Sequence, residues 1–231
     1  MQLASVIQRE VDSVGGIAQN AANTGTPGYK TQTSFTRLVQ SQASDPWRDS
    51  LGKTSLHTSN NLRDGSLKNT GVTTDLALSG DGWFVVSSGH QSWITRDGRF
   101  SVDPAGVLRT AGGLTVMGEH GPLTTGTNGF KVGNDGEVVA DGHLIDRLKL
   151  IRVVDDGVLV SAGNGLYDLP GNASPPLKAL VHQGMLENSN VQVSADMVRL
   201  MEATRHIETM QRALQAYDAV LNSGINQIGK E

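Results

Sequence analysis

The sequence lacks cysteine altogether, which excludes disulfide bonds and thiol-based catalysis. Aromatic residues account for only 4% of the 231 residues and hydrophobic residues for 37%, which argues against the dense core of an α/β enzyme. No apolar run approaches the roughly 20 residues of a transmembrane helix, so we expect no direct membrane insertion. The net charge is −4 and the basic residues do not cluster, so nothing indicates a nucleic-acid partner.

The N-terminal segment also lacks the features of a secretory signal peptide. It has neither a basic stretch nor the continuous apolar stretch that follows one in such peptides. We therefore expect that no signal peptide is cleaved from it.

Catalytic and metal-binding patterns are missing as well. The histidines are scattered, and none has the HExxH spacing or pairs with another at metal-ligand spacing: His57, His90, His120, His143, His182 and His206. No phosphate-binding glycine loop and no GxSxG elbow is present. We interpret His206 as an exposed helix-face residue and Asp141-Gly142-His143 as a hairpin turn. The sequence therefore predicts no catalytic residue, no metal site and no cofactor, and hence no enzyme.

What the chain does contain is an apolar seven-residue repeat at its C-terminal end. Hydrophobic residues at this spacing form one stripe along a helix and need to be buried against other helices. The predicted C-terminal assembly seam consists of Val193, Leu200, Ile207, Met210, Leu214, Tyr217, Leu221 and Ile228. Ala203 stands three residues after Leu200 and fits the same stripe.

A weaker stripe opens the chain. The predicted N-terminal assembly seam consists of Leu3, Ile7, Val14, Ile17 and Ala21. Gly15 and Gly16 lie within this helix and each costs about 1 kcal/mol relative to alanine. We therefore expect this helix to need a partner.

The length of the C-terminal stripe decides between two interpretations. An apolar helix stripe is most often the core-facing side of a globular domain. Here it extends over about 50 Å of helix, at 1.5 Å per residue, which the small body of the protein cannot cover. We therefore favour a seam between paired helices or between molecules.

The middle of the chain is rich in glycine, with 28 in total, and in short apolar runs separated by Asp-Gly or Gly-Gly pairs. Such runs indicate β-hairpins. We predict an α+β fold: a mainly antiparallel β central domain, like a small sandwich or barrel, flanked by N- and C-terminal α-helices that pair as a coiled coil. The predicted segments are an N-terminal axial helix (1–28), an extended connector (29–71), a β-rich outer domain (72–180), a return connector (181–192) and a C-terminal axial helix (193–231).

A short motif ends the first helix. Proline and glycine both interrupt helices, and Pro-Gly is a tight-turn dipeptide. We assign the turn from helix to body to Asn23, Pro27, Gly28 and Tyr29.

Four motifs carry a resemblance to a known family. The first, Asn20–Lys30, is similar to the Asn-Leu-Ala-Asn…Thr-Pro-Gly-Tyr motif of flagellar rod and hook proteins. The second, Leu78–Val86, resembles that family's Gly-x-Gly-Phe-Phe-x-Val motif, and the third, Thr95–Thr110, resembles its Thr-Arg-x-Gly-x-Phe motif. The fourth, Gln183–Val191, resembles its Gln-Gly-x-Leu-Glu-x-Ser-Asn-Val motif. They occur in the family's order and span nearly the whole chain. The length and the ending, Ala216–Leu221, resemble the proximal rod branch most and the distal rod branch next.

The resemblance implies a structural subunit of the bacterial flagellar basal-body rod. It implies that terminal helices polymerise into an axial drive shaft that transmits torque. Its partners would be other copies of itself, neighbouring rod subunits and the flagellar type III export apparatus, and its location the rod in the periplasmic space. A distal rod or hook subunit, an adhesin-like module with a coiled-coil tail, and a hydrolase on a β scaffold are the alternatives. Neither the adhesin-like module nor the hydrolase explains the four motifs.

Overall fold

The computed structural model describes residues 2–39, 53–89, 91–126, 129–153, 159–171 and 173–228. These residues contain two α-helices and seventeen strands. The helices are α1 (Gln2–Ala22) and α2 (Val193–Ile228). The strands are β1 (Gln32–Val39), β2 (Lys53–Asn60), β3 (Leu67–Asn69), β4 (Leu76–Gly80), β5 (Gly82–Ser87), β6 (Ser92–Thr95), β7 (Phe100–Val102), β8 (Leu108–Thr110), β9 (Thr115–Val116), β10 (Lys131–Val132), β11 (Glu137–Ala140), β12 (His143–Arg147), β13 (Leu150–Arg152), β14 (Ser161–Gly163), β15 (Leu166–Asp168), β16 (Ala179–Gln183) and β17 (Met185–Glu187).

The chain divides into two compact units. The first, the helical unit, comprises Met1–Ala22, Ser34–His57 and Gln192–Glu231, and the second, the β unit, comprises Asn23–Thr33 and Thr58–Val191. Most of the segment predicted as a return connector therefore lies in the β unit, where β16 pairs with β4 and β17 pairs with β3. No helix in the described part of the chain is both long and apolar enough to span a membrane.

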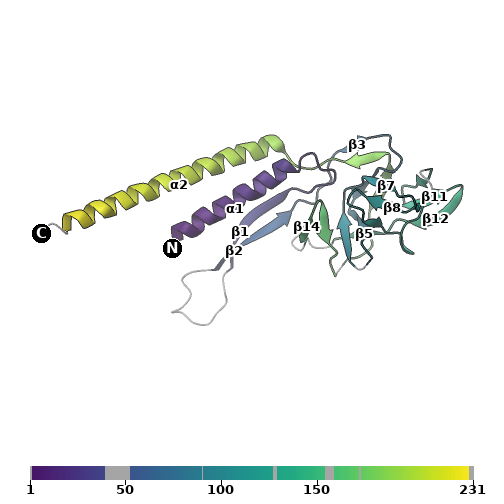
Figure 1. The fold of residues 1–231 in the computed structure, drawn as a ribbon, viewed down its shortest axis with the longest axis horizontal. Coiled ribbons are helices and arrows are strands. Elements are labelled where there is room, and N and C mark those ends of the chain that lie inside the picture. Colours follow the sequence, from purple (N-terminus) through teal and green to yellow (C-terminus); the bar gives the residue numbers. More distant parts are fainter. Residues whose placement is uncertain are drawn as a thin grey trace. The chain divides into compact units, whose positions relative to one another are not determined.

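In the helical unit, α1 and α2 pack side by side and run in opposite directions (Figure 1). The 21 residues of α1 extend over about 32 Å and the 36 residues of α2 over about 54 Å, at 1.5 Å per residue. The C-terminal part of α2 therefore continues past the N-terminal end of α1 (Figure 1).

The β unit is built around β5. In the largest sheet the strand order is β14-β15-β6-β5-β9-β8-β7, with β13 also paired to β5. The side chains of β5 alternate between the two faces. Phe84 and Val86 pack into one hydrophobic cluster, whereas Trp83 and Val85 pack into a second one. Because both faces are covered, this strand is a continuous apolar run in the sequence.

All the strand pairs with a defined register are antiparallel. The predicted α+β fold, with terminal helices packed together and flanking antiparallel β-sheets, is confirmed. Hairpins form at three of the Asp-Gly and Gly-Gly pairs that separate short apolar runs: Gly112-Gly113 between β8 and β9, Asp135-Gly136 between β10 and β11, and Asp141-Gly142 between β11 and β12. Asp156-Gly157 lies outside the described residues.

Two other Asp-Gly turns do not make hairpins. β4, before Gly80-Asp81-Gly82, pairs with β16, and β6, before Asp97-Gly98, pairs with β5 and β15. At Gly98 the backbone passes very close to the backbone of β4: a Cβ on Gly98 would lie 1.5 Å from the carbonyl oxygen of Leu76. The glycine serves a close backbone approach, which local sequence does not distinguish from a hairpin turn.

Candidate assembly site and the motif junction

The predicted C-terminal seam occupies one face of α2. Val193, Leu200, Ile207 and Leu214 are half-buried, and Met210 is buried. Tyr217, further along the stripe, is 62% exposed. The side chains of Leu221 and Ile228 lie outside the described part of the structure. Burial within the chain thus covers the beginning of the stripe and leaves Tyr217 uncovered.

The predicted N-terminal seam lies on α1. Val14 and Ile17 are half-buried and Ala21 is exposed, while the side chains of Leu3 and Ile7 are outside the described part. Asn20 is 2% exposed and completes the buried face in place of Ala21. Asn20 does not belong to the predicted seam because its side chain is polar.

One polar contact joins α1 to α2. Nδ1 of His206 on α2 lies 3.3 Å from Oε1 of Glu10 on α1. His206 is on an exposed helix face, as predicted, with 60% of its side chain accessible, so this pair contributes little.

Asp196 occupies the same stripe on α2, four residues before Leu200, and is 2% exposed. Arg199 Nη1 donates to its Oδ1 at 3.1 Å, whereas Oδ2 has no hydrogen-bond partner among the described residues. A polar group in an apolar helix seam costs stability and favours a single register. The apolar seven-residue repeat did not include Asp196, because its side chain is charged.

The turn after α1 has the conformation that its sequence requires. Tyr29 N–H donates to the carbonyl of Thr26 at 3.2 Å, which closes a β-turn with Pro27 and Gly28 at its centre. Gly28 has a φ of +68°, and a Cβ there would lie 2.3 Å from the carbonyl carbon of Arg96. Proline followed by a left-handed glycine is the type II arrangement. Asn23 also belongs to this turn region, since its Oδ1 accepts from the Thr26 hydroxyl at 3.2 Å.

A buried ionic cluster, the motif junction, lies directly behind this turn. Glu187 is 1% exposed and accepts hydrogen bonds from Lys30 Nζ at 2.7 Å, Arg96 Nη1 at 3.1 Å and the Gly65 N–H at 2.7 Å. Lys30 also donates to the Arg63 carbonyl at 2.8 Å. Two buried cations therefore share one fully buried carboxylate. The half-exposed Asp64 adds a second contact to Arg96 at 3.3 Å.

Aromatic rings enclose the cationic side of the cluster. The Arg96 guanidinium lies 5.3 Å from the centre of the Trp83 ring, and it also donates to the carbonyl of Gly80. Trp83 in turn meets Tyr167 edge-on at 5.3 Å. A stacked guanidinium is stabilised by the ring's negative face.

Asn190 links segments next to the junction through its side-chain amide. Its Oδ1 accepts from the N–H and the hydroxyl of Thr31 at 2.8 and 2.7 Å. Its Nδ2 donates to the carbonyls of Asn61 and Arg63 at 2.8 and 2.9 Å. One side chain therefore satisfies groups on two segments that are distant in sequence.

Burial shifts the pKa of two groups here. Burial and the neighbouring Arg96 lower the pKa of Lys30, and the contact with Glu187 opposes this only in part. Burial also raises the pKa of Tyr167 to about 12, with the nearby Tyr29 acting in the same direction. Both shifts reflect the cost of charge in an interior that water does not reach.

The four motifs of the sequence meet at this junction. Lys30 comes from the first motif, Trp83 from the second and Arg96 from the third, while the fourth supplies Glu187 and Asn190. In the sequence these residues appear only within the motifs that carry the family resemblance, and their mutual contacts were not predicted. The available signal was the single charged residue of the first motif, Lys30, and of the fourth, Glu187. Among the described residues, no cluster of three or more His, Cys, Asp or Glu side chains could hold a metal ion. The junction is suited to fixing chain segments.

Two family descriptions match the chain. Residues 182–228 match the C-terminal region of the flagellar basal body rod FlgEFG proteins, and residues 77–140 match the D1 domain of the flagellar hook protein FlgE/F/G. The first match contains the whole fourth motif and α2, and the second contains most of the β unit's central strands.

Full-length relatives give the same result. The flagellar basal-body rod protein FlgF of Caulobacter vibrioides is 32% identical over 97% of this chain and 94% of its own length. FlgF of Escherichia coli is 30% identical over 87% of this chain and 86% of its own, and FlgG of Buchnera aphidicola is 27% identical over 89% and 90%. These similarities show that the chain belongs to the flagellar basal-body rod FlgE/F/G family, as a structural, FlgF-like rod protein rather than an enzyme.

Proposed function

We propose that this subunit polymerises through its terminal helices into the axial drive shaft of the flagellum and transmits torque there. The observation that carries the proposal is the apolar stripe of α2, which continues to Tyr217 and beyond while Tyr217 remains 62% exposed in the single chain. An apolar helix stripe that its own chain does not cover calls for helices from neighbouring subunits.

The proposed partners are other copies of this chain and adjacent rod subunits. In this arrangement 1–28 and 193–231 are axial, 72–180 forms the outer domain, and 29–71 and 181–192 connect them. The grouping of α1 and α2 in one compact unit, with 72–180 entirely in the other, supports the separation of an axial part from an outer part. Asn23, Pro27, Gly28 and Tyr29 would hold the start of the β unit in a fixed conformation during assembly.

We also propose that the subunit is exported through the flagellar type III apparatus without cleavage of a signal peptide. It would then reside in the periplasmic part of the rod. The family's place in the basal-body rod supports it. N-terminal sequencing of the subunit taken from isolated basal bodies checks the first point. A terminus that starts at Leu3 or later would contradict it.

A proximal position in the rod is the finer proposal, and it rests on the similarity to FlgF proteins. Electron microscopy of basal bodies from cells lacking the gene tests it. Rods that are missing or stop near the inner membrane support a proximal position. Rods that stop near the hook indicate a distal position, and intact rods would contradict the proposed role.

A further inference from the structure

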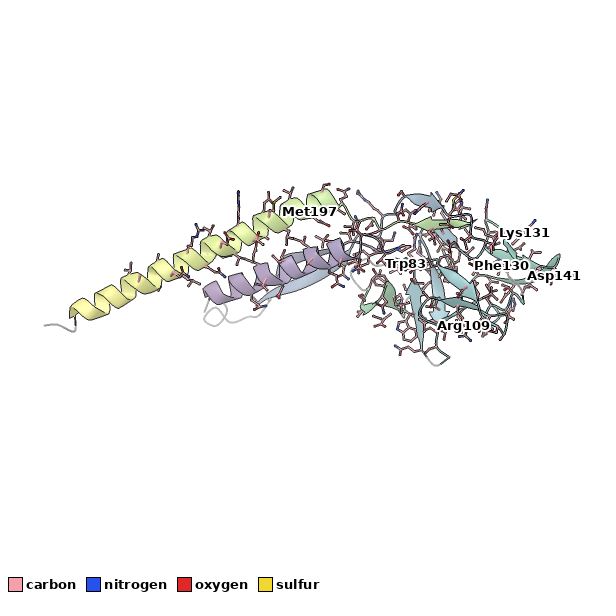
Figure 2. The ribbon with its side chains drawn as sticks, turned by 45° about the horizontal axis from the view of Figure 1, so that its top comes forward. Trp83, Arg109, Phe130, Lys131, Asp141 and Met197 are labelled. Atoms are coloured by element: carbon pink, nitrogen blue, oxygen red, sulfur yellow. The ribbon has the colours of Figure 1, made fainter. Side chains whose placement is uncertain are left out.

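The hairpin β11–β12 leaves one strand edge open in the β unit. β12 is the last strand of the three-stranded sheet β10-β11-β12, so within the described residues only β11 pairs along it as a strand. A neighbouring segment of the same chain reaches β12 only at the end away from the hairpin turn, where Glu119 N–H donates to the Arg147 carbonyl at 2.8 Å. Asp141, with a φ of +52°, lies at the tip of the hairpin, at the outer end of the sheet (Figure 2).

The open edge carries apolar side chains that nothing in the described chain covers. Leu144 is 62% exposed and Ile145, the next residue, is 44% exposed. A bulge causes this: Val138 faces Asp146 and Val139 faces Leu144, so Ile145 is an extra residue in β12. Bulges of this kind re-aim side chains at sheet edges.

Lysine and proline are two of the devices that protect edge strands against pairing with other chains. The outer part of β12, His143–Ile145, contains neither. An exposed edge of this kind is suited to accept an extended segment as an additional strand.

Charge defines what that segment should contain. A surface hollow of about 230 Å³ lies beside Leu144 and Ile145 and is bordered by Glu119, Glu137 and Asp146. Arg147 is held by Glu137 at 2.7 Å and Asp135 at 3.4 Å, and His120 by Asp146 at 2.8 Å.

Glu119 and Asp141 are left without an ion pair to any described residue. The surroundings of the apolar edge are therefore acidic on balance. Acidic surfaces attract basic partners and disfavour acidic ones.

We propose that the outer edge of β12 docks an extended segment of a partner protein in which apolar residues alternate with lysine or arginine. Backbone hydrogen bonds to the edge would supply affinity, and Leu144 and Ile145 would contact the apolar side chains. Glu119 and Asp141 would select the basic ones. This surface belongs to the β unit and does not depend on the helical seams.

Site-specific photo-crosslinking in cells that assemble flagella tests the proposal. A benzoylphenylalanine replaces Leu144 in the full chain, and in a control it replaces Val160, which is 61% exposed on the same unit. We expect a crosslinked product at 144 that is at least several-fold more abundant than at 160. Mass spectrometry should locate the attachment in an extended segment with alternating apolar and basic residues.

Charge reversal provides the second readout. Glu119→Lys together with Asp141→Lys should reduce the crosslink at 144 several-fold. Asp168→Lys, an exposed position on β15, should leave it unchanged. No product above the control at 160, attachment to a helix such as another copy's α2, or a yield that ignores the double reversal would each overturn the proposal.

Discussion

Gly28 fits its position for two separable reasons, its left-handed conformation and its lack of a side chain. Gly71 has the same φ of +68°, but a Cβ there would meet nothing within 4 Å. Gly71→Ala should therefore cost only the conformational penalty, about 1–2 kcal/mol. Gly28→Ala adds a clash with the Arg96 backbone and should cost clearly more in the free energy of unfolding, measured with urea. Equal losses would mean that the turn relaxes away from Arg96.

Glu187 is the one fully buried acid that holds both buried cations. Glu187→Gln leaves Lys30 and Arg96 without their shared charge, and removing one partner from a buried pair costs about 3–5 kcal/mol. Asp64→Asn is the matched control, since this carboxylate is 38% exposed and should cost less than about 1 kcal/mol. Urea unfolding of both variants measures the difference, and similar losses would show that Glu187 does not organise the junction.

The phenol of Tyr167 makes stability depend on pH in the alkaline range. Its pKa rises from 10.0 in the unfolded chain to about 12 in the folded one. Between these values the unfolded chain has lost the proton while the folded chain retains it, so stability falls as pH rises.

Lys30 acts in the opposite direction below its ordinary pKa of 10.5, because its folded pKa is lowered. Comparison with Tyr167→Phe isolates the tyrosine: unfolding curves at a series of pH values should show a shallower alkaline decline in the variant. An identical decline in both proteins would contradict the assignment to Tyr167.

Leu214 lies where the α2 stripe leaves the part paired with α1. Leu214→Asp places a charge in the seam that the assembly needs, so we expect loss of motility with the β unit still folded. The exposed neighbour gives a control, and Gln215→Asp should leave motility unchanged. Swimming assays together with circular dichroism of the purified chains check both. Normal motility of Leu214→Asp would contradict the seam.

The helices and several hairpins could be predicted because their signals are local. The heptad stripe from Val193 to Ile228 coincides with the bounds of α2, and Asp141-Gly142 makes the turn that its sequence favours. The motif junction could not be predicted in this way. Lys30 and Glu187 are 157 residues apart in sequence, and only the pairing of distant strands brings them to 2.7 Å. Buried Asn20 and Asp196 were missed because periodicity arguments count apolar residues alone.

The whole molecule combines a β unit fixed by one ionic junction with a helical unit whose seam is incomplete in the single chain. The β unit pairs its buried cations Lys30 and Arg96 internally, through Glu187. The helical unit instead leaves Tyr217 and Val220 exposed, at 62% and 70%. In the proposed assembly, the β unit supplies the subunit's own stability and the helical unit supplies the contacts to neighbouring subunits.

Thiol labelling of Tyr217→Cys tests the central claim most directly, because the natural chain has no cysteine to interfere. The label should react readily in the dilute purified chain and slowly in isolated basal bodies, where neighbouring helices cover the seam. Val160→Cys, on the β unit, is the control for general access in the same samples. Labelling of position 217 that is equally fast in both states, with the control behaving normally, would contradict assembly through this seam.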